Sequence, residues 1–283
     1  MTVVATGEVV ASASAAGSAV AAFNVITLEH AEAIAAAAER CERPAILQLS
    51  HNAIRWHGAI EPIAAAMRAV AETSTARLGL HLDHIEDVAV LKRAADVGFS
   101  SVMYDAGALP YSENVAATTA AVEWAHSAGV WCEAELGHVG GKPDAVASAH
   151  AEGVRTDPGE AADFVRRTGV DALAVAVGSR HAMTSRDAAL DLDLIAALRA
   201  AVPVPLVLHG SSGVGDEDLR AAVVAGMRKI NIGTALNIAA TSAVRSYLDA
   251  NPAAVDPRKW LDPGRTAMTD IAAHLISCLA GTG

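Results

Sequence analysis

The chain has 283 residues, of which 52% are hydrophobic, so it can bury a large core and is long enough for one α/β barrel domain. Its formal net charge is −11, and its 21 basic residues are scattered along the sequence. This pattern excludes the basic surface that nucleic acids and anionic membranes require, and we expect neither as a partner. An anionic small molecule is still allowed as a ligand, because a few backbone donors can bind a phosphate whatever the global charge.

Short apolar runs alternate with alanine-rich amphipathic stretches along the chain. The predicted strands are 21–26, 45–49, 78–83, 100–105, 130–136, 171–177, 204–208 and 228–232. The predicted helices are 28–41, 59–73, 86–97, 113–128, 158–168, 191–201, 215–225 and 234–249. Strands that alternate with helices indicate a parallel sheet, and eight such units predict a closed (β/α)8 TIM barrel.

Three further segments complete the predicted organisation. The connections 137–157 and 178–190 are longer than a barrel needs and leave its C-terminal face, so we predict that they act as mobile lids. Residues 251–283 form an additional helix-bearing tail. The predicted arrangement is therefore a single TIM-barrel domain over residues 1–283 with a C-terminal helical tail.

The cysteines and the N-terminus indicate a soluble, cytoplasmic protein. Cys41, Cys132 and Cys278 are odd in number and far apart, which suits a reducing compartment better than a disulfide framework. Residues 1–20 carry no Lys or Arg ahead of their apolar residues, and no segment offers about 18 uninterrupted apolar residues.

Three histidines and an aspartate stand where predicted strands end. Asp83 and His84 end the third strand, His181 follows the sixth, and His209 follows the seventh. The C-terminal ends of barrel strands share one face, so these residues can converge although they are far apart in sequence. Three imidazoles can hold a divalent metal and leave a position open for substrate, and Asp83 is then placed to move a proton.

Other polar residues point into the predicted barrel. Period-2 alternation puts both Glu133 and Glu135 on the inner side of the fifth strand, and Asp105 ends the fourth. A buried carboxylate needs a cation or a donor network, so the alternatives are a role in the site or a salt bridge with an internal base. Lys229 also faces inward and could form a Schiff base, but we expect it near the bottom of the barrel, away from the active face.

Two glycine- and hydroxyl-containing loops follow the last two strands. Gly210, Ser211 and Ser212 lie between the seventh strand and a helix, and Gly233 and Thr234 lie between the eighth strand and the next helix. Backbone N–H groups at these helix N-termini are the usual phosphate cradle of barrel enzymes. The sequence therefore predicts a phosphorylated small-molecule substrate.

Five motifs together resemble the class II, zinc-dependent fructose/tagatose-bisphosphate aldolases. They are HLDH at 81–84, EAELGHVGG at 133–141, LAVAVGSRH at 173–181, LVLHGSSG at 206–213 and KINIGTAL at 229–236. The similarity extends into the tail, which looks most like the tagatose-bisphosphate branch. The resemblance implies a cytoplasmic lyase of carbohydrate metabolism and glycolysis that forms a homodimer or homotetramer.

The resemblance also implies residue roles. His84, His181 and His209 would bind the catalytic Zn²⁺, and Asp83 would be the acid/base on the aldehyde-derived oxygen. Asp105 and Glu135 would join His84 in an alternative, buried metal position. Asn231 would hold the enediolate of dihydroxyacetone phosphate. The residues that would cradle its phosphate, together with a monovalent cation (Na⁺ or K⁺), are Gly210, Ser211, Ser212, Gly233 and Thr234.

The sequence departs from the family pattern in the long loop after the fifth strand. Pro143 and its neighbours stand where the family supplies a glutamate that protonates the enediolate carbon. This leaves two alternatives to a ketose-bisphosphate aldolase: a sugar-phosphate-binding zinc barrel with impaired catalysis, and a paralogous aldolase for a phosphorylated deoxy-keto-gluconate. A zinc hydrolase is disfavoured, because residues 21–26 lack the H-x-H pair typical of that class.

Arg258 in the C-terminal tail is a candidate for the second phosphate of a bisphosphate. Its guanidinium offers a planar bidentate fork, and it would reach the substrate of a neighbouring subunit. The alternative is an ordinary surface arginine.

Overall fold

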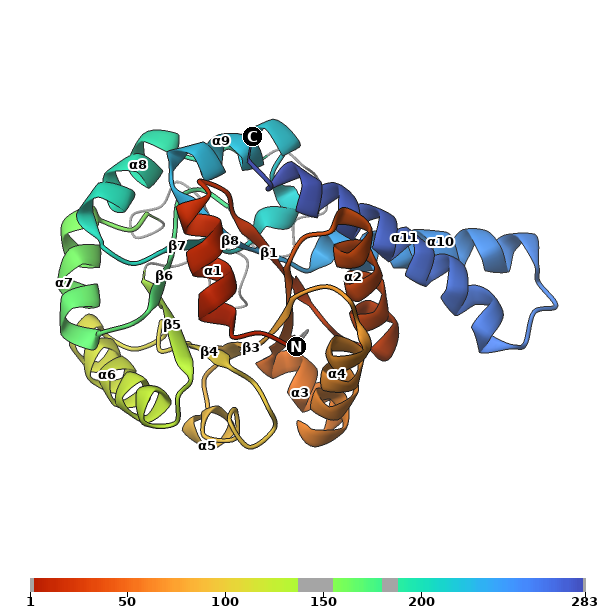
Figure 1. The fold of residues 1–283 in the computed structure, drawn as a ribbon, viewed down its shortest axis with the longest axis horizontal. Helices are drawn as coiled ribbons and strands as arrows, with labels where there is room; N and C mark the ends of the chain where they lie inside the picture. The colour runs from red at the N-terminus through yellow and green to blue at the C-terminus, as the bar shows by residue number, and fades with distance from the viewer. Residues whose placement is uncertain (1–2, 137–154, 180–187, 282–283) are drawn as a thin grey trace.

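A computed structural model describes residues 3–136, 155–179 and 188–281. Eight parallel strands close into a barrel, each paired with the next and β8 with β1 (Figure 1). The strands are β1 Val20–Asn24, β2 Ala45–Ser50, β3 Leu78–Ile85, β4 Ser101–Tyr104, β5 Trp131–Leu136, β6 Ala172–Val175, β7 Leu206–Leu208 and β8 Met227–Ile232. The predicted (β/α)8 TIM barrel is confirmed, and β6 and β7 are shorter than the apolar runs that predicted them.

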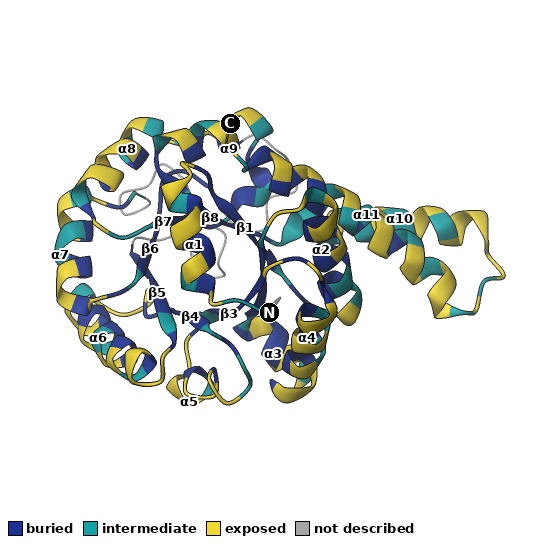
Figure 2. Cartoon of the chain, in the orientation of Figure 1, coloured by how far each residue is buried: buried dark blue, intermediate teal, exposed yellow. Residues whose placement is uncertain are grey.

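Helices surround the barrel and bury their inner faces against it (Figure 2). They are α1 Thr6–Ala15, α2 Leu28–Cys41, α3 His51–His57, α4 Glu61–Thr73, α5 Val88–Leu91, α6 Tyr111–Ser127, α7 Pro158–Thr168, α8 Leu192–Ala201, α9 Asp216–Ala225, α10 Thr234–Ala250 and α11 Pro257–Cys278, with a short 3₁₀ helix, η1, at Ser211–Gly213. The helix predicted at 86–97 is reduced to α5, whereas α1 and α3 were not predicted. The segments predicted as lids, 137–157 and 178–190, lie largely outside the described residues.

Helix α1 lies across the N-terminal end of the barrel (Figure 1). Its Val9 and Val10 pack with Val20, Ala22 and Ile46 from the first two strands, and all of them are buried. The short apolar side chains of α1 therefore close the bottom of the barrel, and the opposite end, where the strands finish, is left for polar residues.

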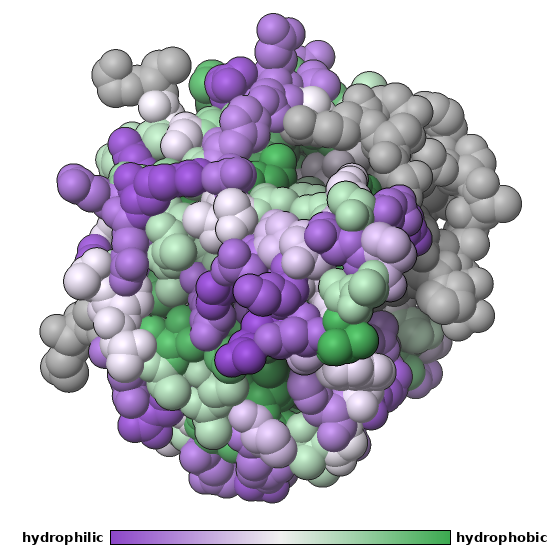
Figure 3. All heavy atoms as spheres, turned by 90° about the vertical axis from the view of Figure 1, so that its right-hand side faces the viewer, coloured by the Kyte–Doolittle hydropathy of each residue, from purple (hydrophilic) through white to green (hydrophobic). Residues whose placement is uncertain are grey.

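Helices α10 and α11 form a hairpin that extends away from the barrel (Figure 1). Helix α11 then returns along α2. Seen from the hairpin end, small hydrophilic and hydrophobic patches are interspersed over the surface (Figure 3). Among the described residues, no helix combines the length and apolar character needed to span a membrane.

Candidate active site

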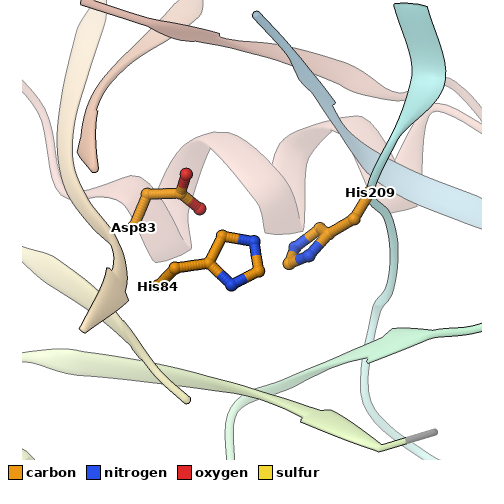
Figure 4. Close-up of side chains that lie close together, drawn as sticks. All are labelled: Asp83, His84 and His209. Atoms are coloured by element: carbon orange, nitrogen blue, oxygen red, sulfur yellow. The ribbon is translucent and has the colours of Figure 1, made fainter. Parts of the chain in front are cut away.

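A break in the ladder at the end of β3 brings two successive side chains to the same place. In a regular strand, Asp83 and His84 would point to opposite faces of the sheet. Here the register between β3 and β4 shifts between Leu82 and Ile85, and His84 has a φ of 50°, a region that residues other than glycine rarely adopt. This irregularity lets both side chains face the C-terminal mouth of the barrel (Figure 4).

Asp83, His84 and His209 form a candidate metal site at this mouth (Figure 4). One ligand atom of each lies within 4.8 Å of the others, and the centroids of the two imidazole rings are 4.8 Å apart. Imidazoles are ligands that suit zinc, so the two histidines present fit the expected metal, and the Asp83 carboxylate lies beside them as the predicted acid/base. His181, the third predicted histidine, lies outside the described residues.

Carboxylates stand behind both histidine rings. Asp105 Oδ2 is 2.8 Å from His84 Nδ1, and Glu135 Oε2 is 2.9 Å from His209 Nδ1. Carboxylates in this position orient metal-binding histidines. Burial alone would lower the pKa of His209, but its hydrogen bonds to Glu133 and Glu135 raise that pKa to about 9. A metal at His209 must therefore displace a proton.

Glu133 and Lys229 form a fully buried ion pair beneath the candidate metal site. Lys229 Nζ is 2.9 Å from Glu133 Oε2, and the other carboxylate oxygen is 3.0 Å from His209 Nε2. Burial would raise the pKa of Glu133, but the Lys229 ammonium outweighs it and holds that pKa below its usual range. The salt-bridge alternative for Glu133 is thus the one observed. The expectation that Lys229 lies away from the active face is wrong, because its side chain reaches residues directly under the site.

His81 is a further buried residue that sequence reasoning passed over. Its Nδ1 lies 2.8 Å from Ser101 Oγ, inside the barrel. Burial, together with the nearby Lys229 ammonium, lowers the pKa of His81 to about 3, so the ring is neutral. The repeat of histidine at 81 and 84 was a signal for it, because alternation places residue 81 on the same inner side as Asp83.

Two side-chain amides clamp the Asp83 carboxylate. Asn231 Nδ2 donates to Asp83 Oδ1 at 3.2 Å, and Asn24 Nδ2 donates to Oδ2 at 3.0 Å. Gln48 Nε2 in turn donates to Asn24 Oδ1 at 3.0 Å, and Lys229 Nζ donates to Asn231 Oδ1 at 2.7 Å. Burial would raise the pKa of Asp83, but the nearby His84, His209 and Lys229 outweigh it, and the pKa is lowered. The carboxylate is therefore ionised and able to accept a proton.

Sequence reasoning missed Asn24 and Gln48. Each is a single amide that directly follows buried apolar residues, in the C-terminal half of its strand. That pattern was a usable signal, since an amide directed into a barrel needs a hydrogen-bonding partner there.

A cavity of about 190 Å³ opens beside Asp83. Its lining residues come from the ends of several strands and from the two predicted phosphate loops; they are Asn24, Ser50, Asp83, His84, Gly210, Ser211, Ser212, Asn231, Gly233 and Thr234. Ser211 Oγ donates to the Asn231 carbonyl at 2.5 Å, and Ser212 Oγ accepts from Ala235 N at 3.3 Å. The structure thus brings the predicted acid/base, one metal-site histidine and the predicted phosphate loops around one space.

The alternative metal position and Arg258 are placed differently. Asp105 and Glu135 contact different histidine rings, and the cluster of metal-ligating side chains found among the described residues includes neither. Arg258 lies near the start of α11, where its side chain is 88% exposed and pairs with Asp256 at 2.7 Å. Within one chain it does not line the cavity beside Asp83, so far as the described residues go.

Fold and site together define a (β/α)8 barrel with a candidate metal centre and a candidate phosphate site on one face. Residues 4–283 match the family model for class-II fructose-bisphosphate aldolase. The chain therefore belongs to the class-II fructose-bisphosphate aldolase family and is an aldolase, a carbon–carbon lyase. The resemblance inferred from the five motifs is confirmed.

Individual relatives agree with this family. The chain is 41% identical over 249 residues to a fructose-bisphosphate aldolase from Geobacillus stearothermophilus, which covers 87% of this chain and 86% of that protein. The solved structure of the YdjI aldolase from Escherichia coli K12 has 32% identity and a TM-score of 0.84, covering 98% of this chain and 97% of the other. The fructose-bisphosphate aldolase of Campylobacter jejuni has a TM-score of 0.83 over 98% and 95% of the two chains, and at 23% identity it supports the fold alone.

Proposed function

We propose that this protein is a zinc-dependent aldolase that cleaves a ketose bisphosphate of the fructose- or tagatose-1,6-bisphosphate type into dihydroxyacetone phosphate and an aldehyde. The observation that carries this proposal is the position of Asp83. Its carboxylate lies within 4.8 Å of a ring nitrogen of His84 and of His209, and it borders the same cavity as both proposed phosphate loops. A base in that place is within reach of a hydroxyl on a substrate whose phosphate occupies the loops.

The proposed metal ligands are His84, His181 and His209. Bound Zn²⁺ would supply Lewis-acid stabilisation of the negative charge that develops when the ketose C3–C4 bond breaks. Asp105 and Glu135 hold the histidine rings through their Nδ1 atoms. The alternative metal position made by His84 with these two carboxylates stays part of the proposal.

Residues of this chain supply the base and the hydrogen-bond donor of the proposed reaction. Asp83 removes the proton of the C4 hydroxyl, and the amides on either side fix the plane of its carboxylate. Asn231 borders the cavity and is placed to donate to the enediolate oxygen. Because Lys229 is paired with Glu133, a Schiff-base route is disfavoured.

The proposed phosphate cradle is built from backbone N–H groups. Gly210 has a φ of 66°, which turns the chain after β7, and η1 follows directly. Gly233 precedes the N-terminus of α10, where the helix dipole favours an anion. Ser211, Ser212 and Thr234 add hydroxyl groups, and we place the monovalent cation (Na⁺ or K⁺) at this cradle as well.

The assembly and the location are also proposals. A homodimer or homotetramer would allow Arg258, exposed on the projecting hairpin, to meet the second phosphate in a neighbouring subunit. Within the described residues no disulfide joins any two of the three cysteines, which accords with a cytoplasmic location.

A substrate panel tests the proposal. Triose-phosphate release is measured by a coupled assay with fructose 1,6-bisphosphate, tagatose 1,6-bisphosphate and a phosphorylated deoxy-keto-gluconate. We expect release from at least one of the two ketose bisphosphates. Release from the deoxy-keto-gluconate alone would indicate the paralogous aldolase. Sugar-phosphate binding without any cleavage would indicate the zinc barrel with impaired catalysis, the alternative suggested by Pro143 in place of the family's glutamate.

A further inference from the structure

Lys229, Asn231 and Asp83 form a chain of hydrogen bonds with a defined direction. The Lys229 ammonium donates to Asn231 Oδ1 at 2.7 Å, and Asn231 Nδ2 donates to Asp83 Oδ1 at 3.2 Å. Lys229 is fully buried, and the other two residues are nearly so. Since residues 229 and 231 are two apart on β8, both side chains face the interior of the barrel.

Only one orientation of the Asn231 amide satisfies both neighbours. An ammonium group has donors and no acceptor, and an ionised carboxylate has acceptors and no donor. The amide has one end of each kind, so its oxygen must face Lys229 and its NH₂ must face Asp83. A rotation by 180° would set two donors against each other at one end and two acceptors at the other.

Lys229 is itself held in place from the opposite side of the barrel. Its Nζ is 2.9 Å from Glu133 Oε2 on β5, and both side chains are completely buried. Lys229 does not line the cavity beside Asp83 among the described residues, whereas Asn231 does. The hydrogen bond to Asn231 therefore links Lys229 to the cavity, and the Lys229 charge acts on the Asp83 carboxylate as well.

We propose that Lys229 is a positioning residue that fixes the Asn231 amide with its NH₂ toward Asp83 and the cavity. This rests on the proposed aldolase function, in which Asn231 donates to the substrate's enediolate oxygen. Asp83 gains and loses a proton in that reaction, so its own hydrogen bond does not hold the amide throughout turnover. Lys229, paired with Glu133 and outside the reaction, keeps donating to the same oxygen.

The test removes the ammonium without leaving a buried charge alone. Lys229→Met by itself would strand the Glu133 carboxylate, which is strongly destabilising. The comparison is therefore between Glu133→Gln, in which the Lys229 ammonium keeps its hydrogen bond to Asn231 Oδ1 and the nearby Asp83 carboxylate, and the double variant Glu133→Gln/Lys229→Met. Lys92→Met is the matched control, because it makes the same chemical change at an exposed lysine.

A second double variant, Glu133→Gln/Lys229→Gln, covers the case in which the methionine variant does not fold. Glutamine keeps a polar, hydrogen-bonding side chain in the barrel. It can accept as well as donate, so it no longer enforces one direction on the Asn231 amide.

The first readout needs no activity. Side-chain amide NMR signals of the metal-free protein are recorded, and the Asn231 signal is identified by its absence in Asn231→Ala. We expect one NH₂ signal with slow solvent exchange in Glu133→Gln, and a loss of this protection, or a second signal, in either double variant. An unchanged, protected single signal would overturn the proposal even if the proposed function also failed.

The second readout is a mutant cycle with Asn231→Ala, in which kcat, KM and solvent-deuterium exchange into dihydroxyacetone phosphate are measured. Relative to Glu133→Gln, the Lys229→Met double variant should lose about ten-fold or more in kcat, and deuterium exchange should fall in the same proportion. Because the effect passes through Asn231, adding Lys229→Met to the Asn231→Ala/Glu133→Gln variant should cost less than about two-fold more. Losses that simply multiply would overturn the proposal and leave the aldolase function intact.

Discussion

Replacing Gly233 by alanine should disturb the hydrogen bond that Asn24 donates to Asp83, although Gly233 itself takes no part in that bond. A Cβ added at Gly233 would lie 2.9 Å from Asn24 Oδ1 and 3.4 Å from its Cγ, although the backbone of Gly233, with φ near −130°, is allowed for alanine. The obstacle is therefore the Asn24 side chain. Its amide must move by about half an ångström to restore ordinary contact.

The cost follows from what Asn24 holds. Its amide accepts from Gln48 and donates to Asp83, both at 3.0 Å, so the shift weakens two hydrogen bonds. Each is worth about 1 kcal/mol, and a methyl group forced into a packed site costs roughly 1–3 kcal/mol. For a chain of this size we expect the melting temperature to fall by about 2–6 °C. A misplaced Asp83 should lower kcat/KM by about ten-fold or more, the equivalent of 1.4 kcal/mol.

Thermal unfolding and steady-state kinetics of Gly233→Ala measure both effects. Gly215→Ala is the control, because a Cβ there meets only Asp218 Oδ2 at an ordinary 3.5 Å and the backbone has φ −69°. We expect the control to stay near wild type in kcat/KM. Wild-type stability and kinetics in Gly233→Ala would refute the idea that Asn24 is fixed between the phosphate loop and Asp83.

Three further changes address the base, the metal and the response to pH. Asp83→Ala should lower the rate of carbon–carbon cleavage by about 10² or more. The variant should keep its metal and should still exchange solvent deuterium into dihydroxyacetone phosphate. Equal loss of cleavage and exchange would contradict the role of Asp83 as the C4 base. His209→Ala should fold but bind less than stoichiometric Zn²⁺ and lose activity, and a full zinc content by elemental analysis would count against the proposed ligand set. Burial lowers the pKa of His30 from its ordinary value of 6.5, so the unfolded chain takes up the proton first and the free energy of unfolding should decrease as pH falls below about 6.5. His30→Gln should flatten this dependence in denaturant titrations at several pH values, and an unchanged dependence in that variant would contradict the assignment to His30.

Local sequence signals were sufficient for much of the fold. Helix α7 has Asp157 as its N-cap and Pro158 in its first turn, and Gly169 ends it in the left-handed conformation, so its predicted bounds match the structure. Helix α1 has weak local signals and is stabilised by closing the bottom of the barrel, which depends on strands from elsewhere in the chain. The helix predicted at 86–97 had an amphipathic pattern but forms only α5 and turns.

In the candidate site too, some features could be predicted from the sequence and others depend on the whole fold. Asp83, His84 and His209 could be brought together from the sequence, because the ends of barrel strands share a face. The clamp on Asp83 could not, since it depends on how β1, β2 and β8 are placed around the barrel relative to β3. The prediction for Lys229 is wrong for a related reason: its backbone lies in the first half of β8, but its long side chain reaches Asn231 and Glu133.

The most direct measurement of the central claim is triose-phosphate release from fructose 1,6-bisphosphate and tagatose 1,6-bisphosphate by the wild-type protein, before and after chelation, and again after one equivalent of Zn²⁺ is restored. The account predicts release from at least one of these substrates, its loss on metal removal, and its recovery with Zn²⁺. Full activity in the chelated, metal-free protein would contradict the zinc mechanism proposed for Asp83, His84 and His209.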